Sequence, residues 1–290
     1  MTEPAPSGPI AASPEEPAGV GPFSRDDQRG EVAFPRLLWL PAACALALVA
    51  LPVAGLGLRT DWVRLPELLF SDAALAALRL SLVTATTSTL LCILFGGPLA
   101  VVLARARLPG LNLVRSVVLL PLVLPPVVGG LALLFLLGRT GLVGRQLDVW
   151  FGVTIPFTTA AVILAQTFVA MPFLVVSLEG TLRVAGRRYE AVAATLGASP
   201  ALAFRRVTVP LVLPGLTSGA VLAFARCLGE FGATVAFAGS LQGTTQTLPL
   251  LVYLDREVDV DAAVALSLLL VVVSVVVIAV ARPRIAAEHR

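Results

Sequence analysis

The sequence contains no lysine, so all 21 of its lysine-plus-arginine positions are arginine. A Walker A phosphate loop needs a lysine that reaches the β- and γ-phosphates of ATP, which excludes that motif here. The only histidine, His289, is the penultimate residue, which argues against a histidine metal site or a Ser-His-Asp triad. Cys44, Cys92 and Cys227 all lie in apolar runs, where we expect small packing residues, no disulfide and no metal site.

Charge is also scarce, at 13% of residues against the 25% or so that is usual in soluble domains. Hydrophobic residues make up 57% of the chain, and the mean hydropathy is +0.92. Such a chain must bury most of its surface in lipid. Apolar runs of roughly 20 residues cross a bilayer, and they predict an all-α polytopic membrane protein with about six transmembrane helices, at 37–58, 77–104, 115–137, 158–180, 211–239 and 261–281.

The first 35 residues differ from the rest, because they hold seven prolines and little periodic hydrophobicity. We expect residues 1–35 to form a disordered cytoplasmic tail, and the late start of the first apolar run speaks against a secretory signal. Residues 36–74 are then a first transmembrane helix with an outer loop. Residues 75–281 form the main transmembrane domain, and residues 282–290 form a cytoplasmic tail.

The arginines also indicate how the chain is oriented. With the N-terminus inside, 14 of the 21 fall in segments on the cytoplasmic side, six fall outside, and Arg226 alone lies within a span. An excess of arginine marks cytoplasmic loops. The distribution therefore predicts a multi-pass protein of the cell membrane with both termini in the cytoplasm.

The polar segment 183–210 interrupts two apolar runs and has an ordered pattern. Gly197 suits the left-handed position that ends a helix, Ser199 suits the cap of a second helix, and Pro200 suits its first turn. These residues predict two short helices joined at Gly197. A membrane protein with such a pair at its inner face presents it to a cytoplasmic partner, although an ordinary amphipathic loop is the alternative.

This segment resembles the coupling loop of ABC-transporter importer permeases, whose pattern is E-A-A, three residues, G, nine residues, I-x-L-P. Nine residues separate Gly197 from Val207, and the sequence VTVP at 207–210 stands where I-x-L-P is expected. Before Gly197 the match is looser, because Glu190 comes one residue early. The resemblance implies contact with an ATPase through Tyr189, Glu190, Ala193, Leu196, Gly197, Ala198, Ser199, Pro200, Val207 and Pro210.

A second motif, from Arg226 to Thr234, lies in the fifth predicted span. Arg226 and Glu230 are four residues apart, so on one helix they share a face and can neutralise each other. Charged residues within a span usually face the bundle interior or a water-filled cavity. The motif therefore predicts either a path or gate element or a purely structural pair, with the residues Arg226, Glu230, Phe231, Gly232 and Thr234. The small residues Gly229, Gly232 and Ala233 permit close helix contacts under both interpretations.

The same motif, R-x-L-G-E-F-G-A-T, resembles the molybdate subset of these permeases more than the sulfate/thiosulfate subset, which departs after the glutamate. The proline-rich run at 120–126 and the sequence TLPL at 247–250 also look like family segments. The predicted outer segments have eight acidic residues and six arginines. Such a face cannot concentrate an oxyanion by long-range attraction, so a separate capture protein would have to select it.

The resemblance implies alternating access in a permease homodimer, with cytoplasmic ABC ATPase subunits and an extracytoplasmic oxyanion-binding protein. It implies no cofactor on this chain, ATP-Mg on the partner ATPase, lipid contact and no nucleic acid. Sulfate is the alternative substrate. An ion-coupled secondary transporter or channel is the alternative of another class, and it would need coupling carboxylates in the spans, where only Glu230 is clearly placed. An intramembrane enzyme would need paired catalytic groups that are not evident.

Small polar residues recur at helical spacing in the second span, at Ser81, Thr84, Ser88 and Cys92. In membrane helices such residues mostly serve packing and backbone hydrogen bonds, and a role in translocation is the less favoured interpretation.

Overall fold

The computed structural model describes residues 36–106, 108–186 and 188–287, and every regular element in these ranges is a helix. The chain divides into two compact units, at residues 1–50 and 51–290. The first unit holds η2 (Arg36–Leu38) and the first half of α1 (Trp39–Arg59), whose described residues are almost all exposed. The predicted tail at 1–35 lies outside the described residues.

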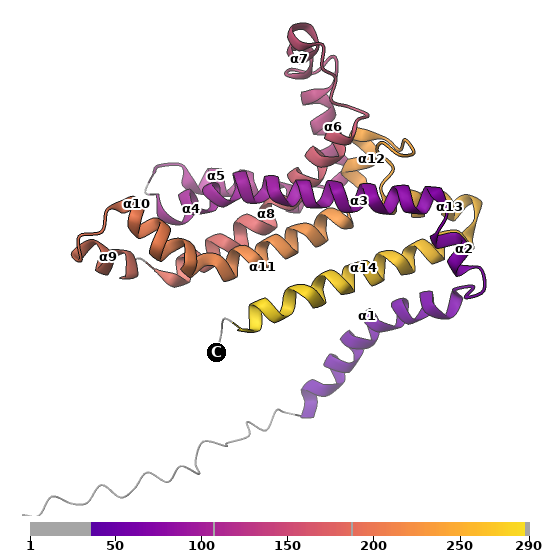
Figure 1. Ribbon diagram of the computed structural model, residues 1–290, viewed down its shortest axis with the longest axis horizontal. Helices are drawn as coiled ribbons and strands as arrows, with labels where there is room; N and C mark the ends of the chain where they lie inside the picture. The colour runs from indigo at the N-terminus through magenta and orange to yellow at the C-terminus, as the bar shows by residue number, and fades with distance from the viewer. Residues whose placement is uncertain (1–35, 107, 187, 288–290) are drawn as a thin grey trace, which may run out of the picture. The chain divides into compact units, whose positions relative to one another are not determined.

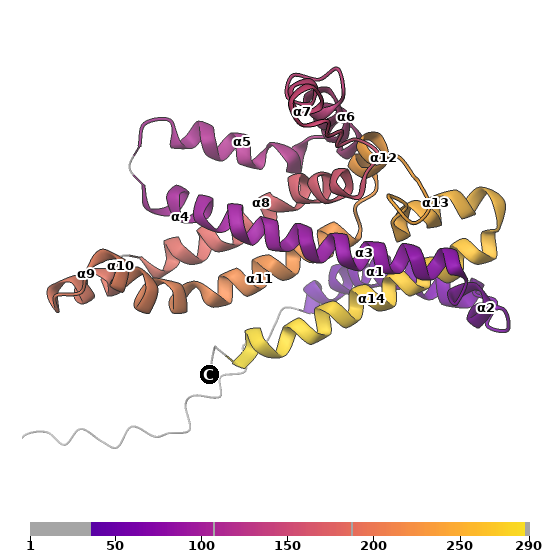
Figure 2. The ribbon, with the colours of Figure 1, turned by 45° about the horizontal axis from the view of Figure 1, so that its top comes forward.

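Long helices of the second unit run side by side (Figures 1 and 2). Within the described ranges, five helical stretches of the chain are long and apolar enough to cross a membrane, at 39–59, 72–105, 159–185, 200–228 and 260–279. The first stretch is α1, and the second is the continuous run of α3 (Asp72–Leu91), η3 (Cys92–Gly96) and α4 (Gly97–Arg105). The third stretch is α8 (Thr159–Ala185), and the fourth is the run of α10 (Pro200–Ala203), η4 (Phe204–Thr208) and α11 (Val209–Leu228). The fifth lies in α14 (Val260–Ala287).

The predicted third span, at 115–137, is not one straight helix. It is broken into α5 (Leu111–Val123) and α6 (Pro126–Leu137), which are bent by 117°. The cause is local, because a residue before proline avoids helical geometry and both Leu124 and Pro125 precede a proline. Their ψ angles are 135° and 133°. The pair makes a sixth span only if it crosses the membrane as a broken element.

The predicted fifth span, at 211–239, is also wrong in its bounds. Its helix begins earlier, at Pro200, and α11 ends at Leu228. A break at 229–231 separates it from α12 (Gly232–Ala238). The motif from Arg226 to Thr234 therefore lies across a joint between two helices rather than along one helix.

Short helices complete the second unit. They are α2 (Leu65–Leu69), α7 (Gly144–Phe151), α9 (Arg188–Thr195) and α13 (Leu248–Val258). Figures 1 and 2 show α9 and α10 at one end of the long helices, where α4 also ends, and α13 towards the other end. We call the end with α9 and α10 the α9 end.

Helix α8 lies at the centre of the second unit, between the α3–α4 run and α11, and it has the largest buried share of any spanning helix. Close packing depends on glycine: a Cβ at Gly215 would collide with Thr181 of α8, and one at Gly219 would lie 3.2 Å from the Leu174 backbone. Small residues of this kind let membrane helices approach closely.

Four small polar residues of α3 and η3 take part in the packing of the unit. Ser81, Thr84, Ser88 and Cys92 are all buried. Ser88 Oγ donates to the Ile163 carbonyl of α8 at 3.0 Å, and Ser81 Oγ accepts from the first N–H of α13, at Leu248, at 2.7 Å. The packing interpretation of these residues is therefore confirmed.

Candidate functional site

The polar segment after α8 folds into two short helices joined at Gly197, as predicted. Gly197 has a φ of +83°. Its N–H donates to the Ala194 carbonyl and the N–H of Ala198 donates to the Ala193 carbonyl, both at 3.0 Å. This pair of bonds is the Schellman ending of a helix, in which glycine accepts the left-handed position at no steric cost. Helix α9 therefore ends in a defined turn at Gly197.

The second helix starts as its sequence predicts. Ser199 Oγ accepts from the Leu202 N–H at 3.3 Å, and Pro200 occupies the first turn, where its missing N–H costs nothing. The chain then continues through the π-helical turn η4 into α11 without a break. The predicted contact residues Val207 and Pro210 lie in η4 and in the first turn of α11. Helix α10 is thus continuous with a membrane-spanning helix.

Exposed apolar side chains gather on α9 and its end. Tyr189 is 58% exposed, Val192 52% and Leu196 83%. Side chains of this size are costly to leave in water. Because α9 and α10 lie at the end of the unit (Figure 1), this surface is open to a partner.

Glu190 connects three elements at the α9 end. Its Oε1 accepts from Arg105 Nη2 of α4 at 3.0 Å and from Thr208 Oγ1 of η4 at 2.7 Å. The side chains of Arg105 and Thr208 are both largely shielded from solvent, unlike the apolar side chains on the surface of α9. The resemblance implied an ATPase contact for Glu190, although this residue comes one position early in the family pattern. The structure shows that it fastens α9 to the ends of two spanning helices.

A second ionic cluster lies nearby and was not foreseen. Glu179 of α8 is buried, and its Oε1 accepts from Arg115 Nη2 of α5 at 2.8 Å and from Arg183 Nε at 3.0 Å. Arg115 also donates to the Leu103 carbonyl of α4 at 3.3 Å. The expectation that Glu230 is the one carboxylate clearly placed within the spans is therefore wrong, because Glu179 also lies within the spanning helix α8. Glu179 is next to the last residue of the predicted span at 158–180.

The predicted pair of Arg226 and Glu230 forms, but not on one helix. Arg226 is on α11, and Glu230 follows the end of that helix. Glu230 is 1% exposed, and its Oε1 accepts from the Ala233 N–H of α12 at 2.8 Å. Arg226 Nη2 lies 2.5 Å from Glu230 Oε2, as an ion pair without hydrogen-bond geometry. Glu230 therefore links the two helices.

The small residues after Glu230 pack α12 against α6. A Cβ at Gly232 would lie 2.9 Å from Pro126, and one at Gly130 would collide with the Ala233 carbonyl oxygen. Thr234 is fully buried. Gly229 makes no such contact, since a Cβ there would meet only its own helix at 3.8 Å. Close approach is thus confirmed for Gly232 and Ala233 and is not seen at Gly229.

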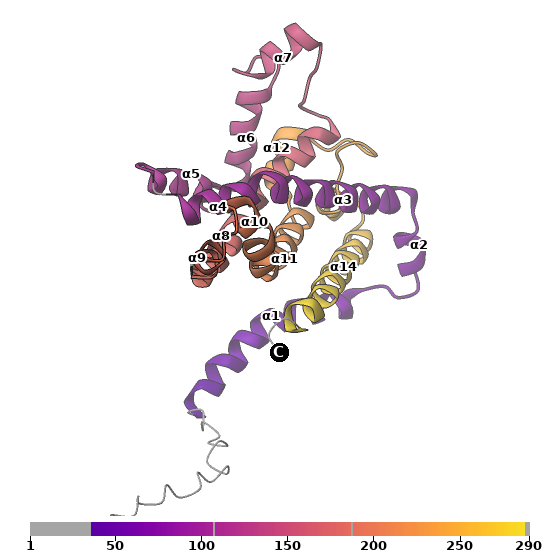
Figure 3. The same cartoon turned by 60° about the vertical axis from the view of Figure 1, so that its left-hand side comes forward.

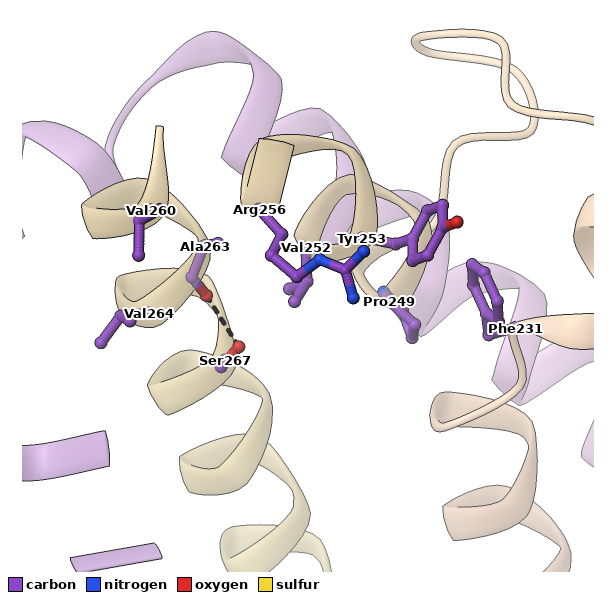
Figure 4. Close-up of a pocket in the computed structure, with 9 residues that line it drawn as sticks. All are labelled: Phe231, Pro249, Val252, Tyr253, Arg256, Val260, Ala263, Val264 and Ser267. Carbon is purple, nitrogen blue, oxygen red and sulfur yellow. Dashed lines mark hydrogen bonds between the residues drawn. The ribbon is translucent and has the colours of Figure 1, made fainter. Parts of the chain in front are cut away.

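Phe231, one of the predicted gate residues, lines a cavity. This cavity, of about 350 Å³, lies between the joint, α13 and the start of α14 (Figure 4). The Phe231 and Tyr253 rings are 4.8 Å apart, and the Arg256 guanidinium lies 5.2 Å from the centre of the Tyr253 ring. Arg256 also donates to Glu257, which raises the pKa of Arg256, while partial burial and the Asp259 charge raise the pKa of Asp255.

The chain is similar to known permeases in sequence and in fold. It is 57% identical over 226 residues to the molybdenum transport system permease protein of Mycobacterium tuberculosis, covering 78% of this chain and 85% of that protein. It is 42% identical over 176 residues to a sulfate transport system permease protein of Synechococcus elongatus, covering 61% of each. A crystal structure of a bacterial ABC transporter involved in the import of alginate matches its fold with a TM-score of 0.67, at 17% identity and over 88% of this chain and 95% of that one.

A family model matches residues 96–285, which include α4, both ionic clusters, the α9–α10 pair and the Arg226–Glu230 joint. The match covers more than half of the chain. The chain therefore belongs to the family of binding-protein-dependent transport system inner membrane components.

Proposed function

We propose that the chain is the membrane-spanning permease subunit of an ATP-driven importer that moves molybdate into the cytoplasm by alternating access. The observation that carries this proposal is the 57% identity to a molybdenum transport permease over 78% of the chain. The complete sequence match of residues 226–234 to the molybdate-type motif supports the same substrate. Tungstate has the same charge and nearly the same shape, so it is a co-substrate in this proposal.

The coupling step is assigned to the α9–α10 pair. In this proposal its exposed apolar surface, including Tyr189 and Leu196, enters a groove on a separate cytoplasmic ATPase, which binds ATP-Mg and supplies the energy. Two features support the assignment. Glu190 ties α9 to α4 and η4, and Glu179 ties α8 to α5. A force applied to α9 would therefore reach several spanning helices at once.

The remaining parts of the proposal concern assembly and orientation. Two copies of this chain form the pathway, and both termini and the α9 end face the cytoplasm, as the arginine distribution indicates. An extracytoplasmic oxyanion-binding protein delivers the substrate. The chain itself binds no cofactor. Membership in a binding-protein-dependent family speaks against the alternative of an ion-coupled transporter or channel.

Sulfate is the second candidate substrate, and the observation in its favour is the similarity to a sulfate permease. That match covers 61% of this chain, against 78% for the molybdenum permease, and its identity is lower. The molybdate proposal is therefore preferred.

Uptake measurements separate the two candidates. The permease, its ATPase and the oxyanion-binding protein of the same organism are reconstituted in vesicles with labelled molybdate or labelled sulfate. We expect uptake of molybdate that requires ATP and the binding protein, with little competition from excess sulfate. ATP-dependent sulfate uptake without molybdate uptake would overturn the substrate in favour of sulfate.

A further inference from the structure

A cavity with a mostly polar lining lies at the α9 end, where α4 ends, α5 begins and α8 ends. Figures 2 and 3 show these three helices reaching this end of the unit. The cavity has a volume of about 520 Å³, and its lining includes the side chains of Arg115 and Arg183 and the first turn of α5 at Leu111 and Asn112. Among the described residues that line it, none is acidic. The wall of the cavity is therefore basic.

The two arginines share a single carboxylate, which lies behind this wall. Glu179 Oε1 accepts from Arg115 Nη2 at 2.8 Å and from Arg183 Nε at 3.0 Å, and Arg183 Nη2 lies 2.9 Å from the same oxygen. Two guanidinium charges against one carboxylate leave the cluster with one positive charge in excess. The Glu179 side chain is 9% exposed, whereas those of Arg115 and Arg183 are 27% and 55% exposed. The excess charge is therefore presented to the cavity and not to the protein interior.

The bonds within the cluster leave donors for a further anion. A guanidinium has five N–H groups. Four of those on Arg115 are engaged, by Glu179, the Leu103 carbonyl and Asn112 Oδ1. The fifth, on Nη1 of Arg115, and the Nη1 group of Arg183 have no partner among the residues that the structure describes. Both arginines can therefore donate to a ligand in the cavity.

The first turn of α5 adds backbone donors to the same wall. The helix begins after Gly110, which has a φ of +86°, and no side chain caps it. The first N–H groups of a helix have no partner within the helix, and the positive end of its dipole lies with them. This turn therefore adds to the attraction that the two arginines exert on an anion.

We propose that this cavity binds the phosphate group of an anionic phospholipid from the inner leaflet. Guanidinium groups bind phosphate oxygens through strong charge-assisted hydrogen bonds, and basic pockets between membrane helices on the cytoplasmic side bind acidic headgroups. A free phosphate ion has the same chemistry, but α5 favours the lipid. Its side chains Leu113, Val117 and Leu120 are exposed and share one face of the helix. Acyl chains below the headgroup can pack along this apolar face.

This inference rests on the proposed orientation, in which the α9 end lies at the inner membrane surface. It goes beyond the proposed transport function, because the lipid is a ligand other than the transported substrate. In this role the lipid joins the ends of α4, α5 and α8 around the Glu179 cluster.

Asn112→Asp tests the excess charge without disturbing the fold. The new carboxylate keeps the shape of the side chain and still accepts from Arg115, and a negative charge suits the first turn of a helix. It also gives the two arginines a second carboxylate, which removes the excess. Arg183→Gln removes the excess in another way and leaves Arg115 paired with Glu179. The matched control is Arg205→Gln, at an exposed arginine of η4 that does not line the cavity, because it lowers the net charge by the same amount.

The complex of permease and ATPase is titrated with phosphatidylglycerol in neutral detergent, and native mass spectrometry measures the bound lipid. We expect Asn112→Asp and Arg183→Gln each to weaken binding by about tenfold or more, because a charge-assisted contact is lost. Arg205→Gln should weaken it by less than about fivefold, the effect of general surface attraction. Thermal unfolding without lipid should be the same in Asn112→Asp and in the wild type, which shows that the loss of lipid is not a loss of fold.

The outcomes separate the lipid site from a soluble anion and from the proposed function. Excess inorganic phosphate should displace little of the lipid, and complete displacement would assign the cavity to a soluble anion. Equal lipid binding by the wild type, Asn112→Asp and Arg183→Gln would overturn the site, while ATP-dependent molybdate uptake by the same proteins would leave the proposed function standing. Lipid binding as expected in a complex that transports no molybdate would support the site and reject the substrate.

Discussion

At the scale of single residues, three carboxylates join the ends of this protein's helices, and two of them, Glu179 and Glu230, are buried. Glu230 joins α11 to α12, Glu190 joins α9 to α4 and η4, and Glu179 joins α8 to α5. Each of them has an arginine partner. Removing one member of a buried pair leaves the other charge without compensation, which costs more than the pair contributes.

The Arg226–Glu230 pair gives an asymmetric prediction. Arg226→Gln leaves Glu230, which is 1% exposed, charged and buried, whereas Glu230→Gln leaves an arginine whose side chain is 25% exposed and can reach water. Glutamine at 230 also keeps an oxygen for the Ala233 N–H. We therefore expect Arg226→Gln to lower stability most, by about 3 kcal/mol, and Glu230→Gln to cost less.

The double change should recover part of the loss, because neither charge is then stranded. Thermal unfolding of the assembled complex in nanodiscs measures the stability of all three variants. Equal losses in the two single variants, with no recovery in the double variant, would show that the residues act separately along a transport path rather than as a joint.

The residues of the candidate site were foreseen unevenly, for physical reasons. Gly197, Ser199 and Pro200 could be predicted because their effect on the backbone is local. The partners of Glu190 could not, because Arg105 lies 85 positions away in sequence. Glu179 was overlooked because it sits at the edge of an apolar run, where a single carboxylate looks like the end of a span.

At the scale of elements, the α9–α10 pair is a rigid corner closed by Gly197. A Cβ at Gly197 would meet nothing within 4 Å, so a larger residue is opposed by the backbone conformation and, in the proposed complex, by the groove of the ATPase, rather than by crowding within this chain. Valine disfavours a φ of +83°, whereas asparagine tolerates the left-handed region well. Comparing the two variants therefore separates the effect of the backbone turn at Gly197 from the effect of a larger side chain at the contact.

We expect Gly197→Val to abolish stimulation of the ATPase by the loaded binding protein while the permease still inserts, and Gly197→Asn to keep most of it. Hydrolysis rates in reconstituted vesicles measure the effect, and the amount of permease in the membrane controls for insertion. Normal stimulation in Gly197→Val would contradict the role of this corner in coupling.

The helices themselves were largely predictable, and their breaks were not. Apolar runs located the first, second, fourth and last spans to within several residues. Hydrophobicity alone does not register a bend, so 115–137 was drawn as one helix although α5 and α6 are bent by 117° at the prolines. In the same way, apolar residues continue across 229–231, where Glu230 and its cap end one helix and begin another.

At the scale of the whole molecule, orientation remains the property on which the other assignments depend. If the α9 end faces the cytoplasm, the ATPase can reach Tyr189 and Leu196. The two clusters centred on Glu190 and Glu179 then lie near the inner membrane surface, where the arginines Arg105, Arg115 and Arg183 agree with the positive-inside rule. The opposite orientation would place the coupling surface outside the cell, away from ATP.

We therefore predict that a reporter active only in the cytoplasm works when fused after Arg290 and when inserted beside Leu196, and fails when inserted at Leu142, in the turn between α6 and α7. Leu142 and Leu196 are both strongly exposed, at 79% and 83%, so the two insertions are matched in accessibility. A periplasmic reporter should give the reverse pattern. Activity of the periplasmic reporter at Leu196 would invert the topology and, with it, remove the physical basis for ATPase coupling through α9.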